Sequence, residues 1–152
     1  MKNRIVVLGL GNPLMSDEGV AIEIVEALSD QADQFEGVDF IDAGCGGMTL
    51  LTYLEGRDKA IIIDCAFMET EPGTIKRFRP DDVTSVKELS HHSLHEVDIL
   101  NVIKLAEQMG SCPEEIVFFG IEPQSVQQQQ YLTALLEQKL PEYIETIKQE
   151  IY

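Results

Sequence analysis

The chain has 152 residues, which suits one domain with a substantial hydrophobic core, and we expect residues 1–152 to form that single domain. Its 11 basic and 27 acidic side chains give a formal net charge of -16. A surface this negative repels phosphate groups, so nucleic acid and anionic membranes are poor partners, and a cation or a basic protein segment is a better one.

The chain shows no charged-then-apolar leader and no apolar run long enough to span a bilayer, so we expect a cytoplasmic protein. Its three cysteines, Cys45, Cys65 and Cys112, are widely spaced and odd in number. This pattern is a poor disulfide framework, and we expect three reduced thiols. We also expect the protein to be a monomer.

Strands and helices alternate along the first half of the chain. Apolar residues predict a strand over 4–10, and apolar residues at helical spacing predict a helix from Val20 onward. A short strand over 38–42 and a helix over 48–54 follow. The β-branched run 60–63 lacks polar side chains, as expected of a strand buried on both faces of a sheet.

The second half continues the alternation. Apolar and basic residues alternate over 74–79 and predict an edge strand, and an amphipathic helix is predicted over 94–109. A further strand covers 115–120, and the C-terminal amphipathic helix is expected to kink or restart at Pro141. The whole pattern predicts a doubly wound α/β/α sandwich whose sheet is mostly parallel, with one antiparallel edge strand.

A glycine-rich turn, Gly9-Leu10-Gly11, follows the first strand, and the acidic pair Asp17-Glu18 follows the turn at the start of a helix. In an open parallel sheet, ligands bind outside the carboxyl ends of the strands. We therefore place Asp17 and Glu18 where a substrate would bind. In the alternative interpretation, the two acids only complement the positive end of the helix dipole.

Glu18, Asp64 and His92 form a candidate metal-binding set, because each follows or precedes an element at what should be one sheet edge. Two carboxylates and an imidazole suit nickel, zinc or similar divalent ions and leave coordination positions open. Each residue also has a structural interpretation: Asp64 as a cap, Glu18 as a solvated acid, and His92 as a loop histidine. His91 and His95 share the segment, so spacing alone leaves the choice of histidine open.

Other catalytic motifs are absent from the sequence. There is no GxSxG, no HExxH, and no third glycine after Gly9-Leu10-Gly11 to complete GxGxxG. Cys45 lies in a glycine-rich loop, but the sequence places no histidine beside it to activate a thiol nucleophile. Serine catalysis, zincin chemistry and nucleotide binding are therefore disfavoured.

An ordered set of segments resembles the hydrogenase maturation proteases, the endopeptidases that trim the C-terminus of a nickel-iron hydrogenase large subunit. Any one segment is weak evidence, but together and in order they are specific. They are Gly9–Pro13 with Ser16–Val20, Asp42–Gly47, Ile63–Ala66, Pro72–Thr74, His92–Asp98 and Phe119–Val126.

The resemblance implies that Glu18, Asp64 and His92 are both the metal ligands and the catalytic residues of an aspartic-type or metal-dependent peptidase. It implies that the nickel belongs to the substrate, and we expect zinc or cadmium to be able to substitute for it. Nickel then either polarises the scissile carbonyl or activates a water, or it serves recognition while a carboxylate acts as general base.

The resemblance also implies that Asp42 and the glycine loop after it, with Gly44, Cys45 and Gly46, accept the C-terminal segment of the substrate. We expect Asp17 to contact the substrate as well. Cys45 departs from the small or hydroxyl residue that is usual in the family. The expected partner is therefore the nickel-loaded large-subunit precursor of a nickel-iron hydrogenase.

Three other functions compete with this interpretation. A non-catalytic nickel-binding maturation chaperone would need the same ligands. Peptidyl-tRNA hydrolases also begin with a strand and Gly-Leu-Gly-Asn-Pro, as in residues 9–13, but the net charge of -16 opposes an RNA substrate and their Thr-Arg-His-Asn stretch is missing. A dinucleotide-binding domain is the third alternative.

Overall fold

The computed structural model describes residues 2–82 and 94–152, with only the backbone described over 94–98. Its described strands form one sheet in the order β2-β1-β3-β5-β4. The strands are β1 (Ile5–Gly9), β2 (Val38–Asp42), β3 (Lys59–Cys65), β4 (Ile75–Phe78) and β5 (Glu115–Ile121).

The sheet is parallel except at one edge. β1 pairs in parallel with β2 and β3, and β3 pairs in parallel with β5. β4 runs antiparallel to β5, with Lys76 opposite Gly120. The predicted mostly parallel sheet with one antiparallel edge strand is confirmed, and each predicted strand lies within one or two residues of its observed bounds.

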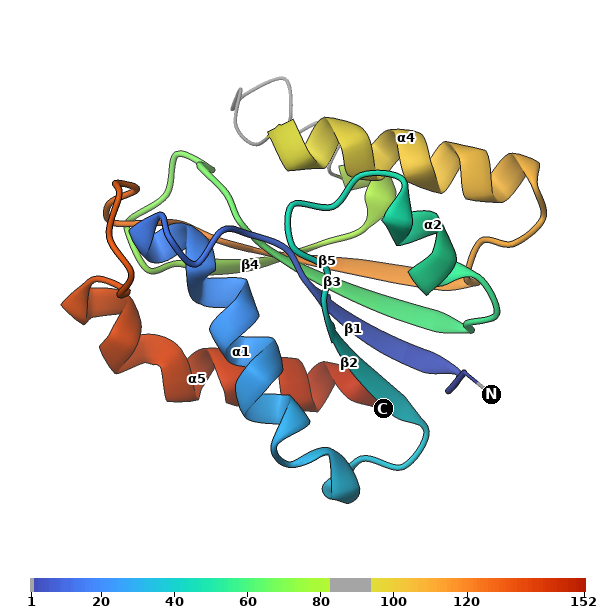
Figure 1. Ribbon diagram of the computed structural model, residues 1–152, viewed down its shortest axis with the longest axis horizontal. Coiled ribbons are helices and arrows are strands. Elements are labelled where there is room, and N and C mark those ends of the chain that lie inside the picture. The colour runs from blue at the N-terminus through green and yellow to red at the C-terminus, as the bar shows by residue number, and fades with distance from the viewer. Residues whose placement is uncertain (1, 83–93) are drawn as a thin grey trace.

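Helices cover both faces of the sheet, which confirms the predicted α/β/α layers. Figure 1 shows α1 and α5 on one face and α2 and α4 on the other. The α-helices are α1 (Val20–Ser29), α2 (Thr49–Leu54), α4 (Leu94–Gln108) and α5 (Ala134–Ile151), and the 3-10 helices are η1 (Ser16–Gly19) and η2 (Ala32–Gln34). No helix in the described part of the chain is long and apolar enough to cross a membrane.

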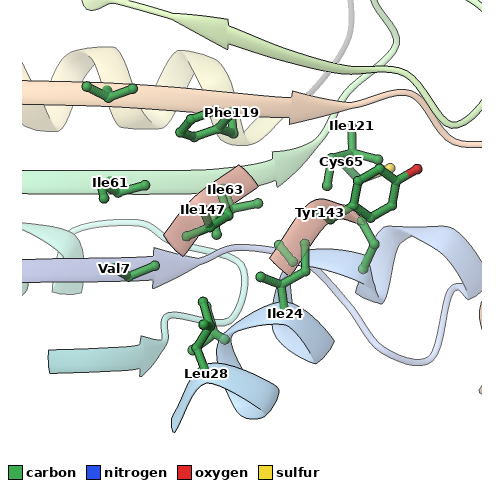
Figure 2. Close-up of a cluster of buried hydrophobic side chains, with 14 of the residues drawn as sticks. Val7, Ile24, Leu28, Ile61, Ile63, Cys65, Phe119, Ile121, Tyr143 and Ile147 are labelled. Atoms are coloured by element: carbon green, nitrogen blue, oxygen red, sulfur yellow. The ribbon is translucent and has the colours of Figure 1, made fainter. Parts of the chain in front are cut away.

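The larger core lies between the sheet and the helices α1 and α5. Its side chains come from alternate positions on the strands, because successive strand residues point to opposite faces. Figure 2 shows this cluster, in which the strand residues Val7, Ile61, Ile63 and Phe119 face Ile24 and Leu28 of α1 and Tyr143 and Ile147 of α5.

A second core lies on the opposite face, between the sheet and the helices α2 and α4. Its buried side chains include Leu8 and Ile62 from the strands, Leu50 from α2, and Ile99 and Ile103 from α4. The central strands are therefore buried on both faces, which explains why their sequences read as unbroken apolar runs.

The C-terminal helix differs from one part of its prediction. α5 runs from Ala134 to Ile151 as one helix with Pro141 inside it, so the expected restart is wrong. Leu136 before the proline and Tyr143 and Ile147 after it are all fully buried in the same core. Packing on both sides of Pro141 thus holds the helix together although the proline lacks a backbone N–H donor.

Candidate functional site at the carboxyl edge of the sheet

The loops that leave the carboxyl ends of the parallel strands are linked to one another by backbone hydrogen bonds. Gly9 of β1 lies opposite both Asp42 of β2 and Ile63 of β3. Beyond the strands, Gly11 N donates to Gly44 O at 2.8 Å, so the glycine-rich turn of β1 contacts the glycine loop of β2. The predicted meeting of strand ends at one edge is therefore observed.

Gly11 allows the chain to pass close to Glu18. It has a φ of +150, and a Cβ atom built at this position would lie 2.0 Å from the carbonyl oxygen of Glu18. No other residue fits there without moving the backbone of η1. The turn after β1 thus fixes where η1, and with it Glu18, lies.

The charges of Glu18 and Asp64 both act on the thiol of Cys65. Burial raises the pKa of the Cys65 thiol well above its ordinary value, and the negative charges of Asp64 and Glu18, in that order, raise it further. Asp64 lies on β3 and is only 5% exposed, whereas Glu18 is half-buried on η1. Two of the three predicted ligands therefore lie on elements that contact each other, η1 and β3, and Cys65 is a protonated structural thiol.

His92, the third predicted ligand, lies outside the described residues, as does His91. Among the described residues alone, no group of three histidine, cysteine or acidic side chains is arranged to hold a metal ion. The oxygen donors of Glu18 and Asp64 suit a divalent cation of the nickel or zinc type only if a further ligand joins them, from another part of the chain or from the substrate.

Asp17 is fully buried and is held by hydrogen bonds from two distant segments. Its Oδ2 accepts from the backbone N–H groups of Gln124 and Ser125, at 2.9 and 3.1 Å. Its Oδ1 accepts from the backbone N–H of Thr133 at 2.7 Å, and the Thr133 hydroxyl also donates to the carboxylate. Because Thr133 is the N-cap of α5, Asp17 ties η1 to the start of the last helix.

Glu122 has a similar role that our sequence reasoning did not assign. It is 6% exposed and follows β5, and its Oε1 accepts from the N–H of Met68 at 2.6 Å and from the hydroxyl of Thr70 at 2.9 Å. It therefore fixes the loop after β3. Its place in Ile121-Glu122-Pro123, an acid directly after a buried strand, was the signal available in the sequence.

The loop after β2 holds the remaining predicted substrate-binding residues. Asp42 and Cys45 are exposed, and Gly44 and Gly46 are half-buried with φ of +56 and +83. The Oδ1 of Asp42 accepts from the N–H of Gly44 at 2.9 Å, which closes the turn. The loop therefore exposes backbone and one thiol beside the turn that positions Glu18, and the thiols of all three cysteines are free.

An apolar pocket lies beside Asp64 on the face of the sheet that α4 covers. Apart from Asp64, its lining comes from the end of β3, from β4 and β5 and from α4, with Ala66, Phe78, Ile99, Phe118, Phe119 and Gly120. Asp64 is thus a carboxylate at the boundary between a nonpolar pocket and the acidic edge, a setting in which charge interactions are little screened.

Comparisons with known proteins identify the family of the chain. The profile of the hydrogenase maturation protease family matches residues 22–150. The hydrogenase 2 maturation protease of Escherichia coli is 31% identical over 147 residues, covering 95% of this chain and 88% of the relative. The chain belongs to the hydrogenase maturation protease family.

The solved structures show the same fold. The hydrogenase-maturating endopeptidase HybD of Escherichia coli superposes with a TM-score of 0.82 at 30% identity, covering 95% of this chain and 89% of that one. A hydrogenase expression/formation protein of Bradyrhizobium diazoefficiens is 36% identical over 121 residues, or 80% of this chain. This chain spans only 63% of that relative, and between 57% and 59% of the next two.

Proposed function

We propose that this member of the hydrogenase maturation protease family is an endopeptidase that removes a C-terminal extension from the nickel-loaded large-subunit precursor of a nickel-iron hydrogenase. The observation that supports this proposal most is that η1, which carries Glu18, contacts β3, which carries Asp64, at the carboxyl edge of the sheet. The relatives named hydrogenase maturation protease or endopeptidase share its family and fold.

In this proposal, Glu18, Asp64 and His92 are the catalytic and metal-binding residues, and nickel enters as part of the substrate. The carboxylate oxygens of Glu18 and Asp64 face the cation, and the imidazole of His92 completes the set. We propose that zinc or cadmium can take the place of nickel, because the same oxygen and nitrogen donors accept these ions.

The extension of the precursor is proposed to lie along the loop after β2, in contact with Asp42, Gly44, Cys45 and Gly46. Gly44 leaves open space where another residue would have a Cβ atom, so a peptide backbone is able to approach closely. Asp17 fixes the position of η1, and thereby of Glu18, through its hydrogen bonds to Gln124 and Thr133.

Hydrolysis needs an attacking water, a group that takes its proton and a charge that stabilises the oxygen of the scissile carbonyl. A carboxylate of the site takes the proton from water as general base, and the proton is later delivered to the leaving amine. The cation that the precursor carries would either stabilise the oxygen of the scissile carbonyl by its positive charge or serve only in recognition of the precursor. The variant Glu18→Gln tests whether Glu18 acts as the base or as a ligand. A glutamine side chain keeps an oxygen that can bind a cation, but it cannot take a proton from water.

The test is the intact mass of a nickel-loaded precursor before and after incubation with this protein, with a nickel-free precursor in parallel. Loss of one discrete C-terminal fragment from the nickel-loaded precursor alone is the expected result. No mass change with any hydrogenase precursor, together with tight nickel-dependent binding, would instead support the non-catalytic maturation chaperone. The monomeric state and the cytoplasmic location stay predictions.

A further inference from the structure

Most of the large hydrophobic side chains that are exposed in the described part of the chain lie on the loops around the candidate site. Leu14, Met48, Phe67 and Tyr131 are between 51% and 74% exposed. They follow the carboxyl ends of β1, β2, β3 and β5, one on each loop. We call these four side chains the apolar rim.

The two other exposed large hydrophobics lie at the opposite edge. Met109 follows α4 and precedes the first residue of β5. Tyr152 ends the chain after α5, and its hydroxyl donates to the carbonyl oxygen of Glu36, just before β2. Exposed hydrophobic residues scattered singly need no explanation, but four on neighbouring loops at one edge do.

The loops that carry the apolar rim are firmly attached to one another. Ser16 N donates to Gln129 O at 2.7 Å and Gln129 N to Leu14 O at 3.0 Å, so the segments of Leu14 and Tyr131 pair. Glu122 holds the loop of Phe67, and Gly11 joins the loop of Met48 through Gly44. Figure 1 shows the segment after β1 beside the loop that precedes α5. The apolar rim therefore lies on loops that hydrogen bonds hold in fixed positions.

The same four loops contain no lysine or arginine, although the chain has 11 such residues. The loops are residues 10–19, 43–48, 66–74 and 122–133. Exposed acids border the rim at Asp42, Glu69 and Glu71. A partner that covers this edge must therefore present an apolar patch with basic side chains around it, since like charges would repel.

We propose that the apolar rim is the docking surface for the folded body of the large-subunit precursor, around the base of its C-terminal extension. This inference rests on the proposed function and adds to it. The precursor would be recognised through an apolar and basic surface as well as through its nickel and its extension. Docking on the rim would hold the extension against Glu18 and Asp64, so binding and cleavage depend on different residues.

A second copy of this chain is a poor occupant of the rim, because its own rim is bordered by acids and its net charge is -16. An anionic membrane is repelled for the same reason. We choose the precursor because the rim lies on the same loops as the candidate site, where its extension is proposed to bind, and a protein interface buries an apolar centre inside a polar or charged border.

The experiment compares two matched double variants. Leu14→Ser with Tyr131→Ser alters two rim residues that are 58% and 74% exposed, and Met109→Ser with Tyr152→Ser alters two residues of the opposite edge that are 62% and 74% exposed. Both pairs are made in a Glu18→Gln background to slow cleavage, and the intact mass of the precursor verifies that it is not consumed. The dissociation constant of the nickel-loaded precursor is then measured by titration.

We expect the rim pair to weaken binding at least about tenfold and the opposite pair to leave it unchanged, because a few exposed apolar side chains dominate most interfaces. Equal dissociation constants for the two pairs would overturn the proposal, as would a dimer of the free protein that only the rim pair dissociates. Circular dichroism verifies that both pairs fold.

Cleavage by the protein with Glu18 intact is scored separately. If the rim controls binding but no precursor is cut, the proposed function fails and the docking surface stands. If the precursor is cut but the rim pair binds and cuts as well as the opposite pair, the docking surface fails and the proposed function stands.

Discussion

Charged residues are arranged differently at the two ends of the parallel strands. We call the end where these strands begin the amino edge and the end where they finish the carboxyl edge. At the amino edge, acids and bases pair with one another, and two of the pairs link strands to Glu150 of α5. The pairs are Arg4–Asp58, Arg57–Asp39, Lys59–Glu115, Lys59–Glu150, Arg77–Glu150 and Arg79–Glu115. At the carboxyl edge, the four described loops 10–19, 43–48, 66–74 and 122–133 contain no lysine or arginine, and the buried acids Asp17 and Glu122 are held by N–H and hydroxyl donors.

The difference teaches that five basic residues form ion pairs at one edge, whereas the buried acids Asp17 and Glu122 at the other edge are held by uncharged donors. A buried carboxylate is tolerated only if hydrogen bonds replace the water that it loses. Backbone N–H groups provide that compensation for Asp17 without neutralising its charge. The acidic side chains of the carboxyl edge would attract the cation of the proposed substrate.

Of the substitutions at the two edges, we expect one at Asp64 to have the largest effect on activity. Asp64→Asn removes a negative charge and a strong oxygen ligand but keeps the size of the side chain, so we expect precursor processing to fall by about 10³-fold or more. The processing rate from intact mass measures the loss, and the far-UV circular dichroism spectrum should not change. Processing within a few-fold of the unaltered protein would contradict the assignment of Asp64 to the site.

Asp17 should show the largest effect on stability. Asp17→Ala leaves the backbone N–H groups of Gln124, Ser125 and Thr133 without their acceptor, and we expect a loss of about 3 kcal/mol in the free energy of unfolding. Urea unfolding followed by circular dichroism is suitable, because the chain has no tryptophan. A loss under about 1 kcal/mol would show that Asp17 does not organise this edge.

Glu150 should show a smaller effect that depends on pH. Burial raises its pKa, but hydrogen bonds from Arg77 and Lys59 outweigh burial, so the pKa lies below its ordinary value of 4.5. The ion pairs therefore stabilise the fold above about pH 4.5, and this contribution is lost as the pH falls through the lowered pKa.

We expect Glu150→Gln to cost about 1.5 kcal/mol at pH 7 and to have little effect at pH 3. Urea unfolding at the two pH values gives the measurement, and precursor processing at pH 7 is the control that should stay unchanged. An equal loss at both pH values would mean that packing, not charge, accounts for the contribution of Glu150.

The smallest effect is expected at Arg4, whose ion pair with Asp58 joins side chains that are 76% and 49% exposed. Water screens such a pair, so Arg4→Ala should leave the thermal midpoint nearly unchanged. A thermal scan at low and high salt measures it. A large, salt-dependent drop in the midpoint would show that even exposed pairs of the amino edge support the fold.

Much of the fold could be predicted from local patterns. The apolar run 60–63 indicates a strand buried on both faces, and the helical spacing from Val20 onward indicates a helix buried on one face. The alternation of strands and helices then leaves few possible topologies. The antiparallel edge strand followed from the alternating basic residues of 74–79. The predicted restart at Pro141 is wrong, because the cost of a proline to a helix is local, whereas the packing of Leu136, Tyr143 and Ile147 that offsets it is tertiary.

The sequence by itself determined the order of elements, the charge of the chain and which acids follow which strands, because these depend on neighbours along the chain. Only the tertiary structure separated the adjacent acids Asp17 and Glu18, since the donors that bury Asp17 lie more than 100 residues away. It also revealed Glu122 as the support of the loop after β3, and it gathered Leu14, Met48, Phe67 and Tyr131 at one edge. Contacts between distant segments decide such roles, and no local pattern encodes them.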